Sequence, residues 1–122
     1  MRTSDIKPYV HINEANANPV HVAEICAGLE EEGIPYAVFA AQGDAKPLAL
    51  NAANHSKLRV GIGITARLAV LQTRNCPIDI PPGEITGNDP ILHVNLLCPT
   101  AASKCRALGT NAARLVKGNI LV

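Results

Sequence analysis

Apolar and polar residues follow one another along this chain in short segments whose spacing predicts alternating strands and helices. Period-two alternation, or a short apolar run rich in β-formers, predicts five strands, at residues 7–13, 36–40, 58–65, 68–73 and 91–97. Apolar positions three and four residues apart, or many Ala and Leu residues together, predict three helices, at residues 19–32, 47–56 and 101–117. This alternation favours a mostly parallel sheet with both faces covered.

The helix at residues 19–32 has the clearest boundaries. Asn18 suits the N-cap position, and Pro19 suits the first turn, where an N–H group would have no helical partner. Gly33 can adopt the left-handed conformation that ends a helix, and Pro35 prevents the helix from resuming. The apolar stripe of this helix consists of Val22, Ile25, Cys26 and Leu29.

The connections between strands refine the predicted fold. Only Ala66 and Arg67 separate the strands at 58–65 and 68–73, so this pair should form a hairpin and make one strand antiparallel. The uninterrupted apolar run at 36–40 is typical of a buried strand. We therefore expect an α/β fold of three layers, with a mixed, mostly parallel five-stranded sheet, one antiparallel strand and helices on both faces.

The length and composition suit one hydrophobic core, since the chain has 122 residues, 48% of them hydrophobic and 17% charged. We expect a single domain over residues 1–122, with a loose tail at 1–6 and a long Pro- and Gly-rich loop at 74–90. The N-terminus lacks the apolar run of a signal peptide, and no segment approaches the ~20 apolar residues of a membrane span. These features predict a cytoplasmic protein with no membrane partner.

Charge and aromatic content argue against a nucleic-acid partner, because aromatic residues make up 2% of the chain and the net charge is +1. The near-neutral total hides an uneven distribution. Residues 1–50 carry three basic and seven acidic side chains, whereas residues 51–122 carry eight basic and three acidic ones. Two solvated faces would explain this pattern, as would one end that meets a basic or metal-bearing surface.

Familiar catalytic motifs are missing from the sequence. The letters GIGITA at residues 61–66 match GxGxxA, but they lie within a predicted strand, where small residues favour close packing of a helix. No P-loop, HExxH, GxSxG or CxxC motif occurs. We expect the four histidines to be structural or solvated and the four cysteines to be reduced, with a disulfide framework as the alternative. The sequence therefore predicts no catalytic residue in this chain.

The unusual feature is Glu30-Glu31-Glu32, which occupies the last turn of a predicted helix immediately before Gly33. The helix dipole disfavours each carboxylate there by about 0.3–1 kcal/mol, and the three charges also repel one another. With a rotation of about 100° per residue, Glu31 points away from the apolar stripe and is the most outward of the three. The cluster is either a solvated acidic turn or the binding place of an outside cation, a hard metal or a partner's Lys or Arg.

Three segments resemble a known family. In order, they are GLEEEGIP at residues 28–35, LRVGIG at 58–63 and LGTNAARLVK at 108–117. The chain resembles, over about residues 7–118, the small subunit of the diol/glycerol dehydratase reactivating factor. The resemblance implies the fold of the medium subunit of adenosylcobalamin-dependent dehydratases. It also implies a large partner subunit with an actin/Hsp70-like ATPase domain. With that partner, the small subunit would release damaged cobalamin from inactivated dehydratase by subunit exchange.

The resemblance also implies a site residue, because the middle glutamate of the family's GLEE turn reaches a Mg²⁺ ion held mainly by the large subunit. That position is Glu31 here. Nucleotide binding belongs to the large subunit, so this chain alone is expected to bind no nucleotide and to be an accessory, non-catalytic subunit. Residues 14–18 and 76–100 depart from the family pattern and leave open which dehydratase is recognised. Association with a bacterial microcompartment is also left open.

Two alternatives from other classes remain at the level of sequence. The chain could be the medium subunit of a diol or glycerol dehydratase, although such subunits are usually longer. It could also be a stand-alone α/β domain that binds a small ligand, with residues 61–65 and 74–90 lining the pocket.

Overall fold

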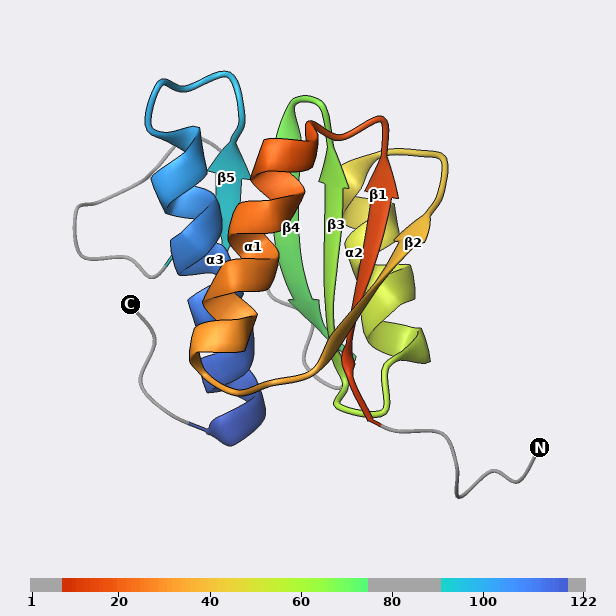
Figure 1. Cartoon of the computed structure of the whole chain (residues 1–122). Helices are drawn as coiled ribbons and strands as arrows, with labels where there is room; N and C mark the ends of the chain where they lie inside the picture. The colour runs from red at the N-terminus through yellow and green to blue at the C-terminus, as the bar shows by residue number, and fades with distance from the viewer. Residues whose placement is uncertain (1–7, 75–90, 119–122) are drawn as a thin grey trace.

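A computed structural model describes residues 8–74 and 91–118, which form five strands and three helices (Figure 1). In chain order, the elements are β1 (Val10–Ala15), α1 (Pro19–Glu31), β2 (Tyr36–Ala40), α2 (Ala45–His55), β3 (Val60–Thr65), β4 (Leu68–Thr73), β5 (His93–Asn95) and α3 (Ala101–Lys117). Among these residues, no helix is both long and apolar enough to cross a membrane.

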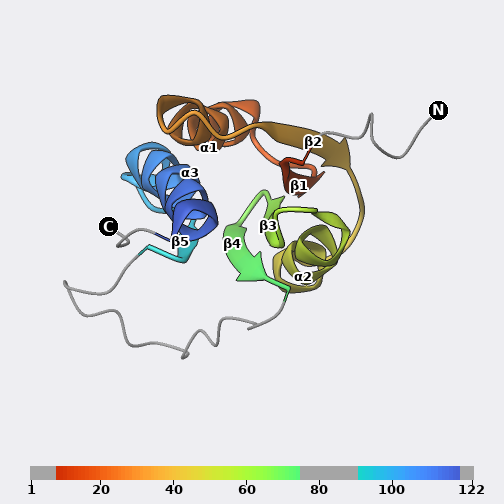
Figure 2. The ribbon, with the colours of Figure 1, turned by 90° about the horizontal axis from the view of Figure 1, so that it is seen from below.

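The five strands form one mixed sheet in the order β2-β1-β3-β4-β5. Strand β1 pairs in parallel with β2 and β3, whereas β4 pairs antiparallel with both β3 and β5. Helices α1 and α3 lie side by side on one face of the sheet, and α2 covers the other face (Figure 2). The predicted three-layer α/β fold with one antiparallel strand is therefore confirmed.

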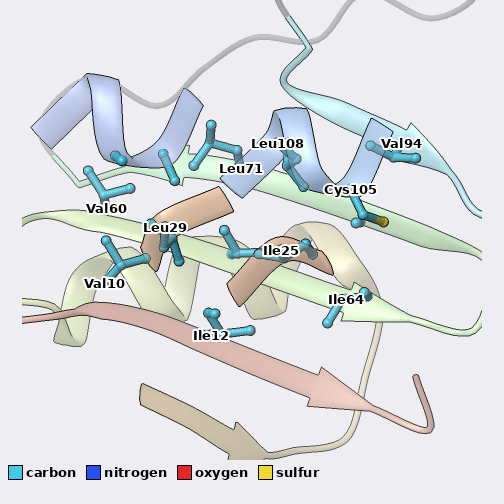
Figure 3. Close-up of a cluster of buried hydrophobic side chains, with 14 of the residues drawn as sticks. Val10, Ile12, Ile25, Leu29, Val60, Ile64, Leu71, Val94, Cys105 and Leu108 are labelled. Atoms are coloured by element: carbon cyan, nitrogen blue, oxygen red, sulfur yellow. The ribbon is translucent and has the colours of Figure 1, made fainter. Parts of the chain in front are cut away.

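The main core lies between the sheet and the α1–α3 face (Figure 3). Alternate residues of β1 explain this placement, because Val10 and Ile12 are fully buried in the main core, while Asn13 donates a hydrogen bond to the Leu48 carbonyl of α2, at 3.2 Å. The largest side chains of this core come from both helices and three strands: Ile12, Ile25, Leu29, Ile62, Ile64, Leu71 and Leu108.

The glycines of β3 face α2 and let its backbone approach the sheet. A Cβ atom on Gly61 would lie within 3.0 Å of backbone atoms of Ala52 and Ala53, and one on Gly63 would meet Ala45 and Ala49 in the same way. The GxGxxA letters at residues 61–66 thus mark the close packing of a helix on this strand, as predicted. This contact leaves no room beside these two glycines for the ligand of a stand-alone binding domain.

The boundaries of several elements differ from the predictions. Strand β1 continues to Ala15, two residues beyond the predicted end at residue 13, because Glu14 and Ala15 pair with residues of β3. The prediction of a buried strand at β2 is wrong, since Val38 is 41% and Phe39 is 38% exposed. Strand β2 lies at the edge of the sheet, where one neighbour is missing. The predicted tail and nearly all of the predicted loop at 74–90 lie outside the described residues.

Candidate functional site

The acidic turn stands at the C-terminal end of α1, which closes in a Schellman arrangement. Gly33 has a φ of +71°, and its N–H group donates to the Glu30 carbonyl at 3.0 Å. The N–H group of Ile34 donates to the Leu29 carbonyl at 3.1 Å, and both of these residues pack in the main core. This closure anchors the turn on its apolar side, so the three glutamates start from a fixed backbone.

The three glutamates of the turn have different partners. Glu30 accepts a hydrogen bond from the Tyr36 hydroxyl at 2.5 Å. Because this carboxylate favours the protonated phenol, it raises the pKa of Tyr36 well above its usual range. Glu32 accepts hydrogen bonds from Arg114 at 3.2 Å and from Lys117 at 3.4 Å, both on α3. Glu30 and Glu32 therefore have partners within the chain. The two explanations drawn from the sequence, a solvated acidic turn and a cation from outside, did not include such internal partners.

Glu31 is the most exposed of the glutamates whose ion pairs the structure defines, with 59% of its side chain accessible against 26% for Glu32. The outward direction predicted from the helical rotation is thus what the structure has. Its Oε1 atom is paired with Nη1 of Arg106 on α3. Arg106 also contacts Glu24, which lies about two helical turns before Glu31. The contacts run from Nε at 3.2 Å and from Nη2 at 3.3 Å.

Sequence reasoning missed Glu24 and Arg106 as members of this site. A signal was available, because Glu24 and Glu31 are seven residues apart and so share one face of α1. The excess of acidic residues before position 51 and of basic residues after it was a second signal. Part of that asymmetry is explained by ion pairs between α1 and α3, which join residues 75 to 85 positions apart.

The described residues do not form a metal site by themselves. None of their His, Cys, Asp and Glu side chains gather in a group of three or more that could hold an ion. Glu31 can nevertheless supply one oxygen, since its Oε1 is held by Arg106 and its side chain remains open to solvent. A carboxylate of this kind fits Mg²⁺, which takes oxygen ligands, only if other ligands come from another molecule.

One cysteine interacts with the acidic turn: burial raises the pKa of Cys26, its hydrogen bond with Tyr36 opposes that rise, and the charge of Glu30 adds to it. The His11 ring stacks on Phe39 with centroids 4.1 Å apart, and His55 lies 6.0 Å from His11. Burial lowers the pKa of His11, and the nearby charge of His55 lowers it further. Free thiols are present at Cys26, Cys98 and Cys105, whereas Cys76 lies outside the described residues.

Comparison with known proteins places the chain in a family. The family described as "Dehydratase medium subunit" matches residues 7–122. The chain belongs to this dehydratase medium subunit family. Curated proteins with similar sequences are small subunits of reactivating factors. The chain is 33% identical over 96 residues to the diol dehydratase-reactivating factor small subunit of Klebsiella michiganensis, which covers 78% of this chain and 68% of the relative.

Further relatives agree with this assignment. The propanediol dehydratase-reactivating factor small subunits of Citrobacter freundii and Salmonella typhimurium are each 34% identical over 96 residues, covering 78% of this chain and 73% of the relative. Among solved structures, a glycerol dehydratase reactivase superimposes with a TM-score of 0.77 and 30% identity, over 95% of this chain and 97% of that chain. The family suggested by the three sequence segments is confirmed.

A second solved structure has a title that names ligands. It is the diol dehydratase-reactivating factor complexed with ADP and Mg²⁺, with a TM-score of 0.77 and 28% identity over 96% of this chain and 99% of that chain. Both likenesses cover nearly the whole chain, so the three-layer fold is that of reactivating factor chains.

Proposed function

We propose that this chain is the small subunit of a dehydratase-reactivating factor, a chaperone-like accessory protein without chemistry of its own. The observation that carries the proposal is the structural match over 95% of the chain, with 30% sequence identity, to a glycerol dehydratase reactivase. The small subunits of the diol and propanediol dehydratase-reactivating factors support it from sequence. The protein would act in the cytoplasm on an inactivated diol or glycerol dehydratase.

The proposed mechanism is subunit exchange with the help of a large ATPase subunit. The chain belongs to a family described as the dehydratase medium subunit, which supports a mechanism in which this domain takes the place of that subunit. Displacing the medium subunit would open a route by which damaged cobalamin leaves the dehydratase. Nucleotide binding and hydrolysis would belong to the large subunit.

Glu31 is the residue that we assign to the contact with the large subunit. Its carboxylate would be one ligand of a Mg²⁺ ion held mainly by that subunit, where the ion would join the two chains electrostatically. The exposure of Glu31 and its position at the end of α1 support this role. The inner part of the same turn is anchored in the core by Leu29 and Ile34, so a docked partner would meet a rigid edge.

The proposal is tested by reconstitution with the large subunit from the same host. The Glu31→Ala variant should bind the large subunit more weakly and support less reactivation of inactivated dehydratase, while its melting temperature stays close to that of the unchanged chain. Glu30→Ala is the matched control, because it removes a charge from the same turn and contacts Tyr36 instead of α3. Reactivation by Glu31→Ala at the unchanged level would count against the role of Glu31.

A second candidate function is favoured by one observation, the family description itself, which names the dehydratase medium subunit. In that case the chain would be part of a catalytic enzyme. Purification from the native host separates the two functions. Co-purification with bound cobalamin and a catalytic large subunit would favour the dehydratase, whereas an actin-like ATPase partner would favour the reactivating factor.

A further inference from the structure

Arg106 connects two carboxylates that lie on one face of α1. Its Nε and Nη2 atoms face the two oxygens of Glu24 at 3.2 and 3.3 Å, and its Nη1 atom is paired with Oε1 of Glu31. Nη1 and Nη2 thus donate hydrogen bonds to the two carboxylates of α1, whereas Nε makes an ion-pair contact with Glu24 without a hydrogen bond. A guanidinium is planar and presents its donors at fixed angles, so it can hold two carboxylates in a defined relation.

We propose that Arg106 is a positioning residue for Glu31: it holds Oε1 and thereby presents the second oxygen of that carboxylate to a cation on a partner. This inference rests on the proposed function, in which Glu31 meets such a cation. An exposed glutamate otherwise samples several rotamers, and that freedom is lost when it binds. A carboxylate that is already oriented avoids much of this loss.

The backbone around Arg106 is fixed by the packing of the two helices. A Cβ atom on Gly28 would lie within 3.0 Å of the Arg106 carbonyl oxygen, so α1 and α3 touch at this point. Glu31 follows Gly28 by three residues and therefore lies nearly one turn further along α1. The distance that the Arg106 side chain must span is set by this crossing.

The charges of the site explain why a positive neighbour does not cancel Glu31. Glu24, Arg106 and Glu31 together carry a net charge of −1, because Glu24 already balances the guanidinium. A cation that approaches Glu31 therefore meets a group of side chains that is negative overall, in spite of the neighbouring guanidinium.

The test follows assembly of the complex with the large subunit as Mg²⁺ is titrated, which requires no measurement of dehydratase activity. Arg106→Gln should raise the Mg²⁺ concentration for half-maximal association about three- to tenfold, the range expected for ordering one side chain. Lys104→Gln is the matched control, because it removes the same charge from the same helix. It should leave the titration unchanged. Thermal unfolding of each variant checks that α3 still packs.

Two further variants separate positioning from charge. Arg106→Lys keeps the charge, but a single ammonium cannot replace a fork that spans Glu24 and Glu31, so we expect it to behave like Arg106→Gln. Glu24→Gln leaves Arg106 unbalanced and should also weaken association, which keeps the proposal testable if Arg106→Gln unfolds. If Arg106→Lys needs the same Mg²⁺ concentration for half-maximal association as the unchanged chain, positioning of Glu31 by the guanidinium group is overturned.

A double-mutant cycle shows whether Arg106 acts through Glu31. In the Glu31→Ala background, Arg106→Gln should have no further effect on association. If Glu31→Ala weakens association but Arg106→Gln leaves it unchanged or makes it tighter, the positioning role is overturned while the proposed function stands. If Glu31→Ala itself has no effect on association, the assigned role of Glu31 fails, and the positioning role fails with it.

Discussion

Gly28 of α1 and Gly109 of α3 meet where the two helices pack together: a Cβ atom on Gly28 would lie 3.1 Å from the carbonyl carbon of Gly109. A Cβ atom on Gly109 would in turn come within 3.0 Å of the backbone of Ile25. The two helix backbones are therefore in direct contact. This contact brings the carboxylates of α1 and the cations of α3 within reach of one another.

The Gly28→Ala variant should be less stable than the unchanged chain by about 1–3 kcal/mol, the usual cost of overpacking a close contact. This loss is expected even though Ala is the better helix former by about 1 kcal/mol. Urea unfolding measures the difference. Gly33→Ala is a useful comparison, because nothing lies within 4 Å of its Cβ position and only its φ of +71° opposes the change, at about 1–2 kcal/mol. Equal stability of Gly28→Ala and the unchanged chain would contradict direct backbone contact.

The Gly61→Ala variant tests the packing of α2 on β3. Because the new methyl group would overlap backbone atoms of Ala52 and Ala53, we expect a loss of about 1–3 kcal/mol or partial displacement of α2. Thermal unfolding and the helical signal in circular dichroism report on the two possibilities. A variant that unfolds like the unchanged chain would show that α2 can move away from the sheet without cost.

The isolated chain should bind no nucleotide, because the glycines of β3 are covered by α2 and the proposed function leaves nucleotide binding to the large subunit. Isothermal titration calorimetry with ADP and Mg²⁺ on the chain alone should show only the heat of dilution. Saturable binding at micromolar concentration would instead favour a stand-alone ligand-binding domain.

Acidification should weaken the contact between α1 and α3 through Glu32. The hydrogen bond from Arg114, with the charge of Lys117, lowers the pKa of Glu32 from its ordinary value of 4.5. Since the folded-state pKa is the lower one, the stabilisation is present above about pH 4.5 and is lost as the pH falls through the folded-state pKa.

The Glu32→Gln variant isolates this contribution. Its melting temperature should be lower than that of the unchanged chain near neutral pH, and the difference should shrink as the pH falls through the lowered folded-state pKa of Glu32. Thermal unfolding across this range gives the comparison. A difference that stays constant with pH would mean that the charge of Glu32 contributes nothing.

The boundaries of α1 and the end of α3 could be predicted because they depend on nearby residues, whereas α2 begins at Ala45, two residues before the predicted start. The Asn18 side chain accepts a hydrogen bond from the Val20 N–H group, Pro19 opens α1, and Gly33 and Gly118 adopt positive φ where helices end. The outward direction of Glu31 follows from the same local geometry, because rotation along a helix is regular. Close packing at the β3 glycines was also predictable, since they lie within an apolar strand.

The position of β2 and the partners of the acidic turn could not be predicted in the same way. An apolar run such as residues 36–40 has the same pattern whether one strand or two flank it, so its place at the sheet edge was missed. Charge counts show that acidic residues come early and basic residues late, but they do not show which of them meet.

The sequence by itself determined the order of elements, the apolar faces, the family and the outward direction of Glu31, because caps, periodicity and motifs are properties of neighbouring residues. Only the tertiary structure decided that Arg106 joins Glu24 and Glu31 and that Arg114 and Lys117 hold Glu32. These pairs span 75 to 85 residues and exist because α1 and α3 pack on the same face of the sheet. Such a contact depends on how all the layers pack together, and no local pattern encodes it.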